Sequence, residues 1–159
     1  DKQSVIGLYI IVSIYTGLRI SDVLRLKWSD LMKEDLVIKE KKTKKLRTIK
    51  INSTIHSVLS KFNLNGEDDF IFKSQKGSVF SIQQINRVLK EIFSTESKHL
   101  NISSHSLRKS FGRRVYENNN ESEKSLVYLS ELFNHTSLSI TRKYLGIRQE
   151  ELNDIYMSL

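Results

Sequence analysis

The hydrophobic and polar positions of this chain repeat mostly with the period of an α-helix. Residues 3–16 are mostly apolar and predict a buried helix, and Gly17 follows the apolar positions as a helix stop. Apolar positions three and four residues apart predict a second helix within residues 18–28. The same spacing predicts helices at residues 55–62, 81–97, 104–118, 124–133, 137–145 and 148–157. The chain is therefore expected to be mainly helical.

A different pattern between residues 35 and 51 predicts a small β-sheet. Residues 36–38 and 46–51 read as two strands, and a turn at residues 42–44 separates them. Residues 69–72 are a candidate third strand. The expected fold class is α+β, mainly α with a small antiparallel β-sheet, and a length of 159 residues fits one domain.

Composition narrows the range of functions. Twenty-six Lys and Arg against eighteen Asp and Glu give a formal net charge of +8, and an isoelectric point of about 9.6 is typical of proteins that bind nucleic acids. The absence of cysteine excludes disulfides and thiolate metal sites, so a cytoplasmic location is expected. The apolar run at residues 5–15 is too short to cross a bilayer, so no membrane partner is expected. Because the chain starts at Asp1 and enters a helix almost at once, we expect it to be part of a longer protein.

Two short segments carry candidate phosphate ligands. His105 and Arg108 lie three residues apart near the start of a predicted helix, with Ser103 or Ser104 as its N-cap, so both side chains project from one face close to free backbone N–H groups. Arg19 follows a turn at residues 16–18, and Asp22 is placed to hold it. The alternatives are a capped helix with a surface arginine and a half-buried histidine, and an ordinary Arg and Asp pair within a helix.

The predicted hairpin turn and the C-terminal segment carry the other candidates. A lysine of the turn could donate a proton or enter a DNA groove, and the alternative is a charged turn that keeps an edge strand soluble. The candidate DNA contacts in the turn are Lys41, Lys44, Lys45 and Arg47. Tyr144 follows His135 by nine residues and would need cationic neighbours to act as a nucleophile, because the unperturbed pKa of tyrosine is about 10. The alternative for Tyr144 is core or interface packing.

Taken together, these elements resemble the catalytic domain of the tyrosine recombinase family, which includes the phage-type integrases, over nearly the whole chain. Residues 16–30 look like the family's first arginine box, Lys42 and Thr43 like its lysine element, and residues 105–108 like its His-x-x-Arg box. His135 matches the second histidine, and Tyr144 falls at the nucleophile spacing. The chain departs from the pattern in having Asn134 where glycine is usual, and asparagine still tolerates a left-handed backbone.

The resemblance implies a catalytic set and a mechanism. The set consists of Arg19, Lys42, His105, Arg108, His135 and the nucleophile Tyr144. Tyr144 would attack a DNA phosphodiester to give a 3'-phosphotyrosyl intermediate, while Arg19 and Arg108 would clamp the phosphate oxygens. Lys42 would protonate the leaving 5'-oxygen, His105 would assist proton transfer from the tyrosine, and His135 would bind the phosphate. No metal and no cofactor would be needed.

The resemblance also implies the biological setting. Residues 1–159 would be the C-terminal catalytic domain of a site-specific recombinase or integrase that serves a mobile element, without the family's N-terminal core-binding domain. Double-stranded DNA would be the partner, the location would be cytoplasmic and nucleoid-associated, and a homotetramer would form on DNA, although the fragment alone could be monomeric. The helix at residues 148–157 would pack on its own chain or on a neighbour. The alternative functions are a type IB-like DNA topoisomerase and a catalytically inactive DNA-binding module.

Overall fold

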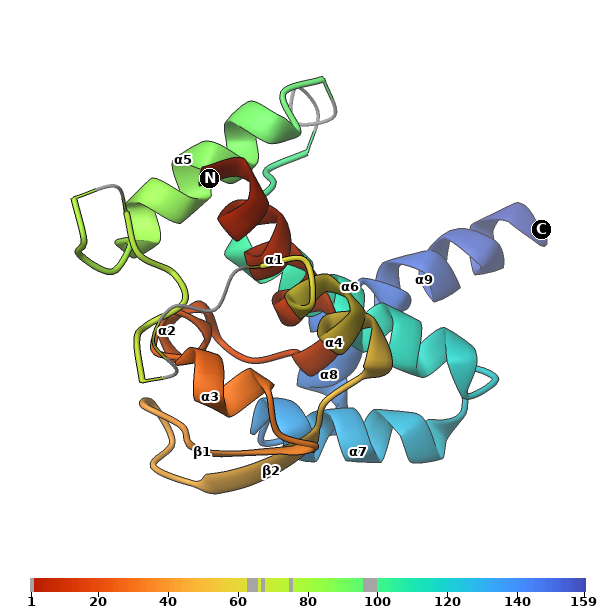
Figure 1. The fold of residues 1–159 in the computed structure, drawn as a ribbon. Coiled ribbons are helices and arrows are strands. Elements are labelled where there is room, and N and C mark those ends of the chain that lie inside the picture. The colour runs from red at the N-terminus through yellow and green to blue at the C-terminus, as the bar shows by residue number, and fades with distance from the viewer. Residues whose placement is uncertain (1, 63–65, 67, 75, 96–99) are drawn as a thin grey trace. The chain divides into compact units, whose positions relative to one another are not determined.

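The computed structural model describes residues 2–62, 66, 68–74, 76–95 and 100–159 and is mainly helical, with one antiparallel sheet (Figure 1). The chain divides into two compact units, Asp1–Arg108 and Lys109–Leu159. The division falls inside helix α6, Ser104–Asn118, so that one continuous helix contributes residues to both units. Each unit has a hydrophobic core of its own.

The first unit contains most of the secondary structure. Its elements before α6 are α1 Lys2–Thr16, α2 Ile20–Val23, α3 Trp28–Leu31, β1 Asp35–Lys39, β2 Leu46–Lys50, α4 Ser53–Leu59 and α5 Ile82–Ile92. Helix α4 begins where the Asn52 side chain accepts a hydrogen bond from the Thr54 N–H at 2.9 Å. Helix α5 begins with a capping box between Ser81 and Gln84. The core includes Tyr9, Leu31, Leu36, Ile55, Phe72, Ile85 and Leu89.

Residues 18–28 do not form the single helix that the apolar spacing predicts. Helix α2 ends at Val23, and α3 begins only at Trp28. Between them the Leu26 carbonyl accepts from the Ile71 N–H at 3.0 Å, and the Trp28 N–H donates to the Asp69 carbonyl at 3.2 Å. Backbone pairing with a distant segment replaces the helical hydrogen bonds here, and spacing along the sequence cannot reveal such a partner.

The predicted third strand is also wrong. Within the described residues the sheet contains β1 and β2 alone, paired antiparallel with Val37 opposite Thr48. Phe70 forms an isolated bridge with Lys27 and does not join this sheet. The predicted helix at 81–97 ends at Ile92, and its residues 96 and 97 lie outside the described residues.

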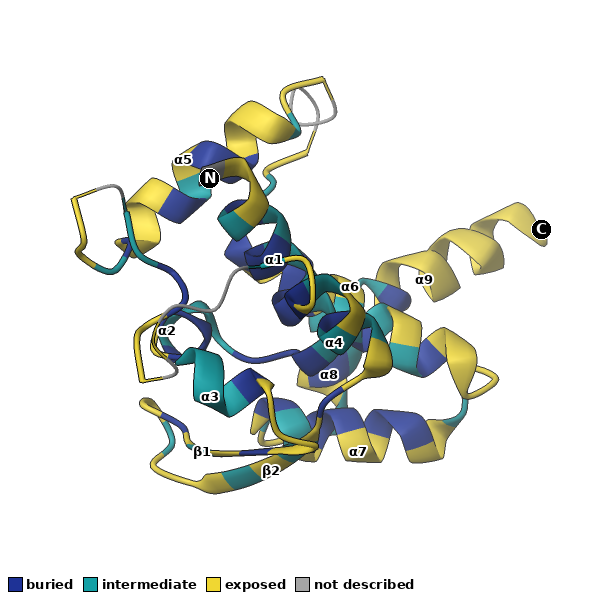
Figure 2. Cartoon of the chain, viewed as in Figure 1, coloured by how far each residue is buried: buried dark blue, intermediate teal, exposed yellow. Residues whose placement is uncertain are grey.

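The second unit consists of the rest of α6 followed by α7 Glu123–Phe133, α8 Leu138–Leu145 and α9 Ile147–Met157. Its core gathers Tyr116, Leu126, Leu129, Phe133, Leu145 and Ile147. Helix α9 is buried only at Ile147, and the rest of the helix is exposed (Figure 2). In the described part of the chain, no helix combines the length and apolar character needed to cross a membrane.

Candidate functional site

Two arginines hold the turn that precedes Arg19. Gly17 adopts a left-handed backbone with φ of 60°, which is favourable for glycine, and ends α1. The Arg108 guanidinium donates through Nη1 to the Gly17 carbonyl, and Arg47 Nη2 donates to the neighbouring Thr16 carbonyl at 3.1 Å. The first unit therefore brings Arg108 to the turn that carries Arg19.

The buried carboxylate of Glu40 joins Arg19 to the hairpin. Its Oε2 accepts from Arg19 Nη1 at 2.9 Å and from Thr43 Oγ1 at 2.6 Å, and its Oε1 lies 3.5 Å from Arg47 Nη1. Burial alone would raise the pKa of Glu40, but the Thr43 hydrogen bond and the charges of Arg19 and Arg47 outweigh it and lower the pKa below the usual value. Glu40 is thus held as an anion between two guanidinium groups.

The carboxylate of Asp22, which was predicted to hold Arg19, bonds instead to Arg25 and to the backbone of Lys41. It is fully buried, and its Oδ1 accepts from Arg25 Nη2 at 2.8 Å and from the Lys41 N–H at 2.8 Å. Arg25 also donates to the Lys39 carbonyl at 3.1 Å. The acidic residue of the first arginine segment therefore attaches the hairpin to α2, and the carboxylate that pairs with Arg19 is Glu40.

The hairpin lysines and Arg47 have different environments. Lys41, Lys42, Lys44 and Lys45 are exposed in the connection between β1 and β2. The Arg47 side chain is 13% exposed and bonds inside the first unit, and burial lowers its pKa in spite of the favourable charge of Glu40. The lysines are accessible to a DNA backbone, whereas the contacts of Arg47 stabilise the protein.

His105 and Arg108 lie on the first turns of α6, with opposite exposure. His105 is exposed, whereas Arg108 is only 6% exposed. The helix begins at Ser104, which leaves Ser103 at the N-cap position, and the Ser104 N–H donates to Asn86 Oδ1 of α5 at 2.9 Å. Helix α5 thereby fixes the end of α6 that carries the two residues.

His135 and Tyr144 lie side by side in the second unit. Their ring centroids are 5.4 Å apart, and the Tyr144 ring packs on Phe133 at 5.3 Å. His135 Nδ1 is 3.0 Å from the hydroxyl of Thr141, a buried residue of α8. The Thr141 hydroxyl at Nδ1 restricts the orientation of the His135 ring. The Tyr144 ring has His135 and Phe133 as aromatic neighbours.

Asn134 adopts the left-handed backbone that the sequence allowed for it. Its φ is 56° and its ψ is 47°, and it caps the C-terminal end of α7. The next N–H, that of His135, donates to the Ser130 carbonyl at 2.9 Å. The turn that glycine usually provides at this position is therefore made by asparagine.

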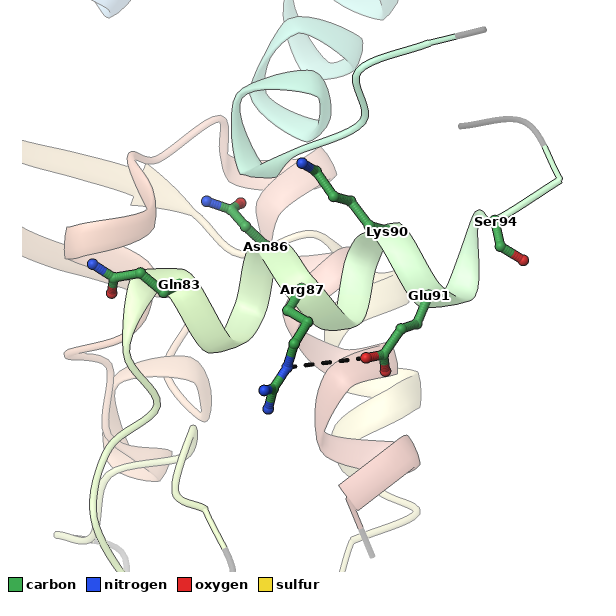
Figure 3. Close-up of a pocket in the computed structure, with 6 residues that line it drawn as sticks. All are labelled: Gln83, Asn86, Arg87, Lys90, Glu91 and Ser94. Carbon is green, nitrogen blue, oxygen red and sulfur yellow. Dashed lines mark ion pairs between the residues drawn. The ribbon is translucent and has the colours of Figure 1, made fainter. Parts of the chain in front are cut away.

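A polar face of α5 was not singled out by the sequence. It borders an open hollow of about 560 Å³ lined by Gln83, Asn86, Arg87, Lys90, Glu91 and Ser94 (Figure 3). Asn86 and Lys90 point to one side of the helix, and Arg87 and Glu91 point to another (Figure 3). Arg87 Nε lies 3.9 Å from Glu91 Oε1. The strong segregation of apolar Ile85, Val88 and Leu89 from these polar positions is the signal that could have marked this face.

The arginines and lysines of the first unit suit phosphate or another oxyanion better than a metal ion. The first unit places two arginines at one turn, with exposed lysines on the attached hairpin. Guanidinium groups offer forked N–H donors to phosphate oxygens. Among the described residues, no group of three His, Asp or Glu side chains is placed to hold a metal.

The sequence profile of the phage integrase family matches residues 4–151. The chain is 33% identical over 149 residues to the probable integrase/recombinase YoeC of Bacillus subtilis, covering 92% of this chain and 80% of YoeC. It is 27% identical over 151 residues to the tyrosine recombinase XerD of Listeria innocua, covering 89% of this chain and 50% of XerD. The chain thus spans most of YoeC but only half of this XerD.

Solved structures show the same fold. The XerH site-specific recombinase bound to its palindromic difH substrate matches with a TM-score of 0.68 and 22% identity, over 97% of this chain and 45% of that one. A lambda integrase dimer bound to a COC' core site matches with a TM-score of 0.60 and 22% identity, over 91% of this chain and 44% of that one. The mainly helical fold with a two-stranded sheet is therefore that of the corresponding parts of these chains.

Proposed function

The chain belongs to the phage integrase family, and from this premise we propose that it is the catalytic domain of a tyrosine recombinase that cleaves and rejoins DNA. The observation that carries the proposal is the hydrogen bond from Arg108 to the Gly17 carbonyl, because it brings the Arg108 guanidinium to the turn two residues before Arg19. Recombination is favoured over topoisomerase activity and over an inactive binding module, since the named relatives are recombinases and every side chain that the chemistry needs is present.

The proposed reaction conserves the phosphodiester bond energy. The Tyr144 oxygen bonds to phosphorus as the bond from phosphorus to the 5'-oxygen breaks, which leaves a 3'-phosphotyrosyl link. Lys42 supplies the proton that the 5'-oxygen gains, and His105 assists removal of the tyrosine proton. Arg19, Arg108 and His135 stabilise the charge that develops on the phosphate oxygens. Attack of a 5'-hydroxyl from a second strand on the phosphotyrosine reverses these steps and completes strand transfer.

DNA binding follows from the charge of the chain and from two surfaces. The exposed Lys41, Lys44 and Lys45 contact the phosphate backbone, which supplies affinity without sequence preference. The polar face of α5 presents the exposed Gln83 and Lys90, side chains of the types that read base edges. The DNA complexes of XerH and lambda integrase support a DNA partner.

The proposal places the chain in a larger, multi-subunit protein. We propose that residues 1–159 are the C-terminal catalytic domain and that a further domain completes the grip on DNA, in keeping with the half of XerD that the chain does not cover. Four copies assemble on two DNA sites, and the exposed apolar side chains Leu152, Ile155 and Tyr156 of α9 dock on a neighbouring copy. We propose that this assembly acts on the nucleoid and recombines the DNA of a mobile element.

The test is covalent trapping on a nicked suicide substrate that carries the attachment site. The full-length protein should form a DNA adduct that survives denaturation, and Tyr144→Phe should abolish it. Tyr128→Phe is the matched control, because Tyr128 is an exposed tyrosine of the same unit and should leave the yield unchanged. Adduct formation with supercoil relaxation but no strand exchange would favour a topoisomerase, and the absence of any adduct in the unaltered protein would favour a binding module.

A further inference from the structure

We propose that Glu40 is a positioning residue for DNA cleavage, which fixes the Arg19 guanidinium relative to the hairpin turn that carries Lys42. The proposal rests on the proposed function, since cleavage is the activity that the positioning serves. Glu40 lies outside both the arginine segment at residues 16–30 and the lysine element at Lys42 and Thr43. Its importance comes from its contacts with both. It is the last residue before the lysine-rich turn.

The contacts of the carboxylate reach both catalytic segments. Oε2 bonds to Arg19 Nη1 and to the hydroxyl of Thr43, the residue that follows Lys42. One oxygen atom thus connects the start of α2 to the tip of the hairpin. A displacement of either segment must break one of two short hydrogen bonds.

The backbone of Glu40 closes the turn. Its N–H donates to the Lys45 carbonyl at 2.9 Å, and its carbonyl accepts from the Lys44 N–H at 3.0 Å. Lys44 has a left-handed φ of 59°, which gives the turn its tight shape. The side chain of Glu40 is 5% exposed, so it cannot swing into solvent without opening this turn.

The negative charge of Glu40 allows the positively charged side chains of Arg19 and Arg47 to lie close together. Arg19 and Arg47 both approach its carboxylate, and the charge of Arg19 acts to lower the pKa of Arg47, as expected for neighbouring cations. A neutral side chain at position 40 would leave these guanidinium groups to repel each other. Arg19 is the more exposed of the two, with 19% of its side chain accessible, so it is the one that should move.

Another possible role for the carboxylate is that of an inhibitor that occupies Arg19 until a DNA phosphate displaces it. Burial, the Thr43 bond and the closed turn argue against displacement. The two roles predict opposite effects, because loss of an inhibitor would accelerate cleavage, whereas loss of a positioning group would slow it.

The experiment compares Glu40→Gln with Glu34→Gln, an exposed glutamate beside the other end of the hairpin, in single-turnover cleavage by the full-length protein. Glu40→Gln should slow cleavage by about 100-fold, the effect of a small misplacement of a catalytic group, and Glu34→Gln should leave it unchanged. In an Arg19→Ala background, Glu40→Gln should cause less than about a 2-fold further loss, because the group that it positions is gone. An equal loss in both backgrounds, or faster cleavage in Glu40→Gln, would overturn the proposal.

A second measurement separates this proposal from the proposed function. Side-chain NMR of Arg19 should show a restrained guanidinium in the unaltered chain and in Glu34→Gln, and a mobile one in Glu40→Gln, while a thermal melt checks that each variant is folded. Absence of a covalent adduct with the unaltered protein would refute the recombinase function, and the NMR result would still decide whether Glu40 holds Arg19. A guanidinium equally restrained in Glu40→Gln would refute the positioning role even if cleavage occurs.

Discussion

Residues with a left-handed backbone stand beside three of the proposed catalytic side chains. Gly17 lies two residues before Arg19, Asn134 immediately precedes His135, and Gly146 lies two residues after Tyr144. Each of them ends a helix, so the direction of the chain changes next to a reactive group. The position of each reactive side chain therefore depends on a residue that has no chemical role of its own.

Replacing Asn134 should show this dependence. Asn134→Ala should lower the free energy of unfolding by about 1 kcal/mol, because alanine is strained in the left-handed region. Asn134→Gly should preserve or slightly raise stability, since glycine is the usual residue at such a helix end. Chemical denaturation of both variants measures the difference. Equal stability of the two variants would mean that the backbone here relaxes to another conformation.

The stability of the protein should depend on pH through Tyr9, because burial raises the pKa of its hydroxyl to about 12. The unfolded state ionises near pH 10 and the folded state only at higher pH, so the stabilising contribution is present below pH 10 and is lost as pH rises from 10 to about 12. Between pH 9 and 11 the unfolding free energy should therefore fall by roughly 1 kcal/mol more in the unaltered chain than in Tyr9→Phe. Urea titrations at the two pH values provide the measurement, and parallel losses would show that Tyr9 ionises normally.

At the scale of elements, helix α6 packs closely against its neighbours at Gly112. A Cβ atom at this position would lie 2.7 Å from Leu145 Cδ2 and 2.9 Å from Phe133 Cε2. Both neighbours are almost fully buried, at 1% and 2% exposure, and cannot easily move away. They adjoin Tyr144 and His135, so the approach of α6 to α7 and α8 affects the position of the proposed nucleophile.

Gly112→Ala should therefore destabilise the protein. Overpacking costs about 1–3 kcal/mol, which exceeds the gain of about 1 kcal/mol that alanine brings to a helix interior. Gly7→Ala in α1 is the matched control, because no atom lies within 4 Å of its added Cβ, and it should raise stability by up to about 1 kcal/mol. Thermal unfolding distinguishes the two, and a stabilised Gly112→Ala would show that Phe133 and Leu145 adjust freely.

At the scale of the whole molecule, the net charge of +8 is the property that most affects encounters with DNA. The exposed hairpin lysines concentrate part of this charge on one short segment, whereas Arg47 is already neutralised by Glu40. Electrostatic affinity should therefore depend on where a charge lies as well as on the total.

Removal of two hairpin charges should change the salt dependence of DNA binding. Lys44→Gln with Lys45→Gln should lower the slope of log affinity against log salt by about 2, or about 1 for each lost phosphate contact. Lys33→Gln with Lys61→Gln removes the same charge from exposed positions outside the hairpin and should change the slope little. Fluorescence anisotropy with a short duplex at several salt concentrations gives both slopes, and equal changes would attribute binding to net charge alone.

The sequence predicts what depends on local spacing, and the structure adds what depends on distant partners. Helix α1, the hairpin and the helices after residue 104 follow from periodicity and from stop signals such as Gly146. The break between α2 and α3 depends on pairing with residues 69–71, which lie some forty residues away. The prediction for Asp22 is wrong for the same reason, because its partner is the backbone N–H of Lys41 in the hairpin. Glu40 belongs to no sequence motif, so the sequence does not indicate its role. The assignments of the catalytic side chains remain predictions that the cleavage experiments address.

The closed turn at residues 40–45 has a consequence for the evolution of this segment. Its ends are joined by the Glu40 and Lys45 backbone bond, and β1 and β2 continue from it in fixed register. An added residue within either strand would shift that register and turn Leu36 or its neighbours to the opposite face, whereas exchanges of exposed side chains at the tip alter no backbone bond. Natural variants of this hairpin should therefore conserve its length, together with Glu40, Thr43 and the proposed catalytic Lys42, while the other exposed side chains of the tip vary.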